Sequence, residues 1–173
     1  MKKPSPVHIE LEIPSHADEI SGYVKMVLTK LTDHIAIDPG TERRIKLILI
    51  ELITNSIKHS TDDNGLIKLT ISHPGITIQK VDKGLHIELK TESLPFREVN
   101  KTLKVSFSEQ NNHQIKVLDK YKFQFLDPFK EELSLDYMPE HFGLYIITLA
   151  ADVFTYQYDP ERKENSFIVS INI

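Results

Sequence analysis

The stretch Arg44-Ile-Lys-Leu-Ile-Leu-Ile-Glu51-Leu-Ile-Thr-Asn55-Ser-Ile-Lys58-His59 decides how this chain folds. Its isoleucines and leucines recur at the spacing of an amphipathic helix, which predicts one long and largely buried helix. At about 100° per residue, one stripe of this helix collects the polar side chains and one isoleucine: Arg44, Ile48, Glu51, Asn55, Lys58 and His59. The predicted helix therefore has an apolar back for a core and a polar front that faces something else.

Regular patterns precede this helix. Strict alternation of apolar and polar residues over 7–13 predicts a half-buried strand. Apolar residues at helical spacing over 17–34 predict an amphipathic helix. The turn Asp38-Pro39-Gly40 separates the two helices, and Thr41 is then placed to cap the second.

After the long helix the pattern changes to short strands joined by turns. Strands are predicted over 66–72, 76–81, 85–89, 103–107, 121–126, 154–158 and 166–173. Asp82-Lys83-Gly84 predicts a hairpin between the second and third of these strands. Helices are predicted over 112–120 and, from a nearly continuous apolar run, over 139–154.

This order of elements predicts an α+β fold, because hairpins dominate and helices do not alternate with parallel strands. We expect a two-layer sandwich with a mixed, mostly antiparallel sheet and the helices on one face. The length of 173 residues is that of one domain, so 1–173 is treated as a single unit. The segment 97–136 is the least regular part and is expected to be an insertion or an extended lid; its strand-like pieces favour a structural insertion.

Composition narrows the function classes. The formal net charge of −4 argues against a nucleic-acid or anionic-membrane surface. The absence of cysteine excludes disulfides, thiolate catalysis and cysteine-bound metals. The sequence has no signal-peptide pattern and no apolar run of membrane-spanning length, so a soluble, cytoplasmic protein is expected.

Glu51 and Asn55 are the first candidates for chemistry, because residues four apart share one helix face. A carboxylate and an amide at this spacing can hold a divalent cation on phosphate oxygens, with the carboxylate polarising a water or hydroxyl. An ordinary solvated stripe is the alternative. The eight histidines show no pair at helical metal spacing, and the sequence has no Walker loop.

Two motifs carry a resemblance to a known family. Residues 51–59, Glu-Leu-Ile-Thr-Asn-Ser-Ile-Lys-His, resemble the N-box of the GHKL ATPases in the form found in anti-sigma factors and histidine-kinase catalytic domains. Residues 141–156, which begin His-Phe-Gly-Leu-Tyr, are similar to the second glycine box and following helix of the anti-sigma (serine protein kinase) branch. Residues 165–171 resemble that family's last strand.

The resemblance implies a Bergerat-type fold that holds Mg-ATP between sheet and helices. It implies that Glu51 is the general base and that Asn55 binds magnesium through the phosphates. It places four more residues in the nucleotide site: Lys58 and His59 near the phosphates, and Gly143 and Leu144 in the second glycine box.

The glycine boxes depart from the family pattern. The first box, Asp-x-Gly-x-x-Phe, has an Asp that reads the adenine amino group. Its expected place holds Thr91, Ser93 and Phe96, where only the Phe is kept, and a rival place at 126–129 offers an Asp without a Gly. In the second box His141 stands where the first glycine belongs, so it either obstructs the phosphates or hydrogen-bonds them.

These observations lead to three expectations for function. The first is a regulatory domain that resembles anti-sigma factors, has weakened nucleotide binding and acts through a protein partner such as a sigma factor or its antagonist. The second is an active Mg-ATP-dependent protein kinase that uses Glu51. The third is a structural α+β domain without nucleotide. ATP and Mg²⁺ are the expected cofactors unless they have been lost, and a homodimer is a further option.

Overall fold

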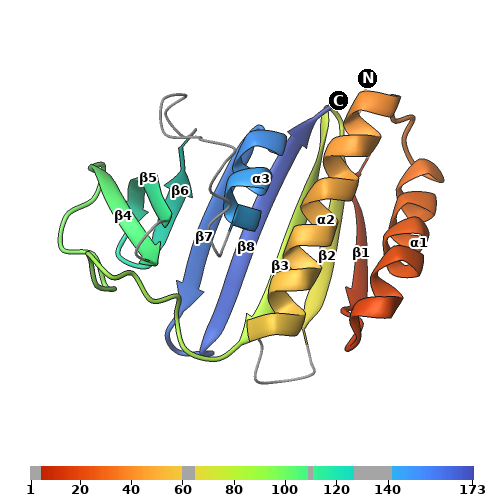
Figure 1. Cartoon of the computed structure of the whole chain (residues 1–173). Coiled ribbons are helices and arrows are strands. Elements are labelled where there is room, and N and C mark those ends of the chain that lie inside the picture. The colour runs from red at the N-terminus through yellow and green to blue at the C-terminus, as the bar shows by residue number, and fades with distance from the viewer. Residues whose placement is uncertain (1–4, 60–64, 109–110, 127–141) are drawn as a thin grey trace, which may run out of the picture.

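The computed structural model describes residues 5–59, 65–108, 111–126 and 142–173. The elements in chain order are β1 (Val7–Glu12), the short 3-10 helix η1 (Ala17–Glu19), α1 (Ile20–Thr32), α2 (Pro39–His59), β2 (Leu66–Ser72), β3 (Gly75–Lys83), β4 (Thr102–Ser108), β5 (Asn111–Asp119), β6 (Lys122–Phe125), α3 (Phe142–Ala150), β7 (Val153–Asp159) and β8 (Glu164–Asn172). They form two layers, with α1, α2 and α3 on one face of a single sheet (Figure 1). The predicted α+β class and the placing of helices on one face are confirmed.

The described strands form one open sheet in the order β1-β2-β3-β8-β7-β6-β5-β4. Every neighbouring pair is antiparallel. β8 lies near the middle of the sheet, where its whole length pairs with β3 from Gly75↔Asn172 to Lys83↔Glu164. The predicted sheet is therefore present, with antiparallel pairing throughout the described part.

The core lies between this sheet and the helices. Alternate residues of β2, β3 and β8 are buried, as expected where one strand face meets a helix layer. The back of α2 covers them, and its fully buried side chains include Ile45, Ile48, Leu49 and Ile53. Ile48 is buried, although the sequence pattern places it in the polar stripe. The polar front in the structure is therefore narrower than the predicted stripe and begins at Glu51.

Two predicted elements are wrong. Residues 85–89 form no strand, because the place beside β3 where a hairpin would put them is taken by β8. Leu85, predicted to be the first residue of that strand, is 88% exposed. Residues 112–120 lie largely in strand β5 and not in a helix, since His113, Ile115 and Val117 alternate as buried positions.

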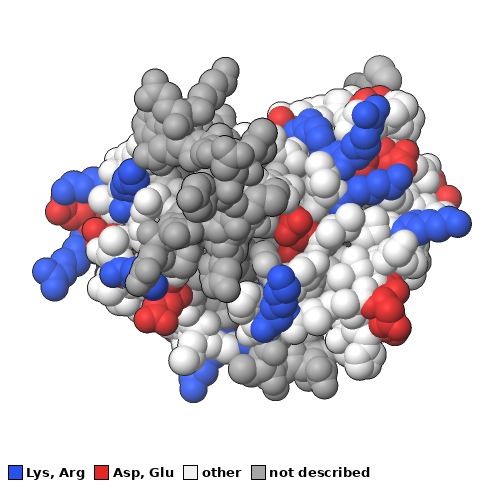
Figure 2. Space-filling view, viewed as in Figure 1, with Lys and Arg blue, Asp and Glu red and all other residues white. Residues whose placement is uncertain are grey.

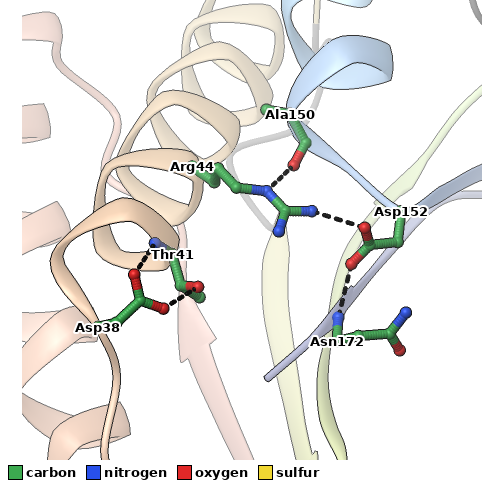
Figure 3. A network of polar contacts seen from close by, with 6 residues as sticks. All are labelled: Asp38, Thr41, Arg44, Ala150, Asp152 and Asn172. Carbon is green, nitrogen blue, oxygen red and sulfur yellow. Dashed lines mark hydrogen bonds and ion pairs between the residues drawn. The ribbon is translucent and has the colours of Figure 1, made fainter.

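The cap of α2 is also different from the prediction. The side chain of Asp38 accepts hydrogen bonds from the main-chain N–H groups of Gly40 (2.8 Å) and Thr41 (3.2 Å) and from the Thr41 hydroxyl (2.5 Å) (Figure 3). The hydrogen bonds from Thr41 and Gly40 lower the pKa of Asp38. Asp38 therefore caps the helix, and Thr41 supports the cap.

A polar contact network fixes α2 against the end of α3. Arg44 donates from Nε to the carbonyl of Ala150 (2.6 Å), and its Nη2 pairs with Asp152 (2.9 Å) (Figure 3). The second carboxylate oxygen of Asp152 accepts a hydrogen bond from the main-chain N–H of Asn172 (2.6 Å). One arginine thus joins α2, α3 and the end of β8, and so sets the distance between the two helices.

The segment 97–136 contributes strands to the sheet. β4, β5 and β6 continue the same sheet beyond β7, and on β6 Phe125 packs against Phe154 and Phe123 against Tyr156 of β7. The described part of the segment therefore forms regular strands of the sheet, and its identification as an insertion stays a prediction. Residues 127–136, and residues 139–141 of the predicted last helix, lie outside the described residues.

Candidate functional site

A cavity of about 380 Å³ lies between the helices and the sheet. Its lining comes from α2, α3, β3, β4, β8 and the irregular segment after β3: Asn55, His59, Lys80, Asp82, Leu85, Ile87, Glu88, Phe107, Leu144, Asn165 and Phe167. This volume is within the range of sites that bind small molecules. The lining combines aromatic faces with a few polar groups, which is typical of such sites.

The helical end of the cavity is formed by α2 and the first turn of α3. A Cβ atom built on Gly143 would overlap Glu51 Oε2 and would lie 3.6 Å from Asn55 Nδ2. The present position of the Glu51 carboxylate therefore depends on a glycine at 143, whereas the distance to Asn55 is an ordinary contact. Asn55 and His59, one turn apart on α2, and Leu144 on α3 complete this end.

Glu51 is half-buried at this end. Burial raises the pKa of its carboxyl above the ordinary value of 4.5, and the nearby charge of Lys58 opposes the shift. A carboxyl with a raised pKa is a better proton acceptor when ionised, which suits a general base. The Glu51 carboxyl is therefore better suited to act as a base than a fully solvated carboxyl on a helix surface.

The sheet end of the cavity carries a largely buried ion pair. Lys80 and Asp82 are two residues apart on β3, point to the same face and contact each other through Nζ and Oδ2. Their side chains are only 5% and 13% exposed. Lys80 Nζ also lies 5.0 Å from the centre of the Phe167 ring on β8. A cation and an anion are thus held side by side in the cavity wall.

A second polar network fixes the irregular segment that closes this end. The main-chain N–H of Ile87 donates to the Tyr156 hydroxyl (2.8 Å), which donates to Asn165 Oδ1 (2.6 Å). The Asn165 amide donates in turn to the carbonyl of Leu85 (3.0 Å). Tyr156 and Asn165 are both buried, so residues 85–87 are anchored to two side chains of the protein interior.

The structure brings some of the sequence-predicted site residues together. Five of them lie at or beside the helical end: Glu51, Asn55, His59, Gly143 and Leu144. Lys58 is close enough to Glu51 to affect its pKa. Residues from the two motifs thus lie near one another, and the roles assigned to them stay predictions.

The residues expected for the first glycine box lie elsewhere. Thr91, Ser93 and Phe96 line a separate polar depression beside β4. There the Thr91 hydroxyl accepts a hydrogen bond from the main-chain N–H of Ser106 (3.3 Å), and Phe96 packs against Phe123. His141 lies outside the described residues. So does the rival box at 126–129, except for its first residue, Leu126.

Lys80 and Asp82 are the site residues that sequence reasoning missed. Both are in phase with Ile76 and Ile78, which the alternation of β3 places on the core face. Asp82-Lys83-Gly84 also has the Asp-x-Gly spacing of the first glycine box. The same three residues are also a good hairpin turn, so the sequence pattern alone does not distinguish a site from a turn.

Comparison with known proteins adds no relative. No protein-family model matches the sequence, and no curated protein matches it significantly. Among the described residues, no cluster of three or more His, Cys, Asp or Glu side chains could hold a metal ion. In the same part of the chain, no helix has the length and apolar character needed to cross a bilayer.

Proposed function

We propose that this chain is a regulatory domain of the GHKL type, with a Bergerat-type fold, that binds a purine nucleotide weakly and acts through a protein partner. One observation carries the proposal: a single cavity is lined by Asn55 and Leu144 at one end and by Asp82 at the other, and Gly143, next to Leu144, lies close to the Asn55 side chain. The N-box, an Asp-x-Gly and the second glycine box are far apart in the sequence. Their meeting at one cavity supports a nucleotide site.

The lining suggests how a nucleotide would lie. The phosphates would occupy the helical end, where the Asn55 amide and the His59 ring supply polar contacts. The base would lie towards the Phe107 and Phe167 side chains and the carboxylate of Asp82. Mg²⁺, when bound, would neutralise phosphate charge, and the residue that fits it as a ligand is Asn55 through its side-chain oxygen.

The sheet end explains why binding would be weak. Asp82 already has a cationic partner in Lys80, and both side chains are largely buried. A base that hydrogen-bonds Asp82 must compete with this pair or rearrange it. Separating two buried charges costs several kcal/mol unless the ligand replaces what each charge loses, at roughly the scale of a broken buried ion pair.

The helix face offers a surface for a protein partner. Leu47 and Ile50 lie one turn apart on α2 and are 46% and 39% exposed. Arg43, Arg44 and Lys46 belong to the first half of α2, and Figure 2 shows basic side chains gathered there beside an uncharged stretch. An apolar stretch with a charged border is typical of protein-binding surfaces.

An active protein kinase is the second candidate, and Glu51 is the observation that favours it. Its raised pKa and its position against Gly143 suit a base that takes the proton from an attacking hydroxyl. This candidate predicts slow ATP hydrolysis that Glu51→Gln abolishes without loss of nucleotide binding. Binding without measurable hydrolysis would favour the purely regulatory role.

Thermal unfolding with and without nucleotide tests the proposed function. At about ten times the dissociation constant, Mg-ATP should stabilise the fold by roughly 1.4 kcal/mol, which raises the unfolding midpoint by a few degrees. Asn55→Ala should remove the magnesium dependence of this shift. Thr54→Ala, one residue earlier on α2 and outside the cavity lining, is the matched control.

The proposal has a clear contrary result. If the folded protein shows no stabilisation by ATP, ADP, GTP or GDP at about ten millimolar with Mg²⁺, the cavity is not a nucleotide site of useful affinity. A shift that Asn55→Ala and Thr54→Ala leave equally unchanged would remove Asn55 from the site.

A further inference from the structure

Lys80 lines the cavity together with the acid that it pairs. The two side chains contact each other through Nζ and Oδ2, so a hydrogen-bond donor and an acceptor lie side by side in the cavity wall. We infer that Lys80 is a second base-contacting residue, which donates a hydrogen bond to N1 of a bound adenine while Asp82 accepts one from the N6 amino group. This inference rests on the proposed nucleotide site.

The ion pair leaves both partners with hydrogen-bonding capacity. An ammonium has three N–H donors and a carboxylate has two oxygens, and the contact between Nζ and Oδ2 occupies one donor and one oxygen. The Phe167 ring, whose centre is 5.0 Å from Nζ, attracts the charge of Lys80 without being a conventional acceptor. A ligand that offers an acceptor and a donor can therefore bind Lys80 and Asp82 by rearranging the pair instead of separating it.

The purine edge that carries the exocyclic group has this arrangement. Adenine presents the acceptor N1 next to the N6 amino donor, and guanine presents O6 next to N1–H, so the pair by itself complements either purine. Adenine is the base that the resemblance in residues 51–59 and 141–156 implies. An acceptor for Lys80 also offsets part of the cost of approaching Asp82, because each buried charge then keeps a hydrogen-bond partner.

Lys80 is the side-chain donor of this end that can serve a ligand. Among the described residues that line the sheet end, the side chains with N–H donors are those of Lys80 and Asn165. Asn165 is buried, its Oδ1 accepts from the Tyr156 hydroxyl, and its Nδ2 donates to the carbonyl of Leu85. Asn165 therefore holds the segment after β3, and the contact to the ring acceptor falls to Lys80.

Binding of Mg-ATP and of Mg-1-deaza-ATP to the unmodified protein tests the inference. The analogue keeps the N6 amino group but has a C–H in place of N1, so it lacks only the acceptor for Lys80. Titrations followed by NMR chemical shifts measure affinities in the weak range expected. We expect 1-deaza-ATP to bind about tenfold or more weakly than ATP, the effect typical of losing a hydrogen bond to a charged group. Mg-7-deaza-ATP, which is altered on the other ring of the base, should bind like ATP.

The outcomes separate the inference from the proposed function. Equal binding of ATP and 1-deaza-ATP overturns the inference and leaves the proposed nucleotide site in place. An equal loss of affinity for 1-deaza-ATP and 7-deaza-ATP also overturns it, because the effect is then not specific to N1. Absence of binding by ATP overturns the inference and the proposed function together.

Two variants assign the contact to one residue. Lys80→Met removes the ammonium, so it should bind ATP about tenfold more weakly and should bind ATP and 1-deaza-ATP alike. Lys83→Met removes the same charge from an exposed position on β3 and should keep both the ATP affinity and the difference between the two ligands. A preference for ATP over 1-deaza-ATP that survives in Lys80→Met overturns the assignment. The ligand comparison on the unmodified protein decides the outcome even if Lys80→Met is too unstable to study.

Discussion

The two ends of the cavity are built on opposite principles. At the helical end a glycine brings main chain against Glu51, and burial of that carboxyl raises its pKa. At the sheet end Asp82 is more deeply enclosed, with 13% of its side chain exposed, but Lys80 beside it compensates the charge. Burial thus raises the pKa of Glu51, whereas the charge of Asp82 is balanced by its ion pair with Lys80. The difference teaches that one cavity can hold an enclosed acid in two ways, by burial without a bonded cation or by direct pairing with a lysine.

The largest effect is expected from breaking the ion pair. Asp82→Ala leaves Lys80 buried without its anion and should lower the free energy of unfolding by about 3 kcal/mol. Urea unfolding measures the change. The double variant Lys80→Met/Asp82→Ala should recover most of it, since neither charge remains. If the double variant is as unstable as the single one, the pair is not the source of the cost.

The next effect tests how firmly the sheet end is held. Tyr156→Phe removes the hydroxyl that accepts from Ile87 and donates to Asn165, leaving two buried groups unsatisfied. We expect a loss of about 2 kcal/mol in unfolding free energy and faster hydrogen exchange at the Ile87 amide. Unchanged protection of that amide would show that the network does not hold residues 85–87.

A substitution at Gly143 tests the helical end. Gly143→Ala forces the Glu51 carboxylate to turn away, because the new Cβ would overlap Oε2. Stability should change by no more than about 1 kcal/mol, since the flexible side chain can move and alanine favours helix. The pKa of Glu51, followed by NMR, should move back towards its ordinary value, and nucleotide binding should weaken.

Gly22→Ala in α1 is the matched control for this change. A Cβ there meets nothing within 4 Å. It should bring the same gain in helix propensity without effect on Glu51 or on nucleotide. An unaltered Glu51 pKa in Gly143→Ala would contradict the close approach.

The smallest effect is expected for Glu51→Gln. Burial raises the folded-state pKa of Glu51, so the folded protein keeps this proton to a higher pH than the unfolded chain does. Its contribution to stability therefore falls as pH rises from the ordinary value of 4.5 through the folded-state value. Glu51→Gln should stabilise the protein at pH 7 by about 0.5 kcal/mol or less, because the half-exposed carboxyl is partly screened by solvent. At pH 4 the gain should shrink, and a gain that is equal at both pH values would contradict this origin.

Much of the fold could be predicted because its elements follow simple periods. The helical spacing in 44–59 and the alternation in 66–72 and 166–173 each fixed an element that the structure contains. The errors came where local signals were ambiguous. Residues 82–84 suit a hairpin, yet β8, from about eighty residues later, fills the place beside β3. Local turn chemistry cannot reveal a competitor so distant in sequence.

The candidate site was predictable only where one helix carries it. Glu51 and Asn55 are one turn apart, so their common face follows from helix geometry alone. Lys80 and Asp82 also share a face, but a charged pair on the buried side of a strand contradicts the usual polarity pattern. The core face of β3 continues from the apolar layer into the cavity, so Lys80 and Asp82 line the cavity instead of packing in the core.

The central place of β8 has a consequence for how the protein folds. Until that strand is made, β3 remains an open edge, and the sheet is split between β1-β2-β3 and β4-β5-β6-β7. Pairings between residues 75–83 and 164–172 close a long loop, which slows folding relative to local hairpins. A growing chain would therefore leave one edge of β3 unpaired while the residues between Lys83 and Glu164 are made, slightly less than half of the chain. The polar residues on the outer face of β3, Thr77 and Gln79 among them, reduce the risk that this edge recruits other chains.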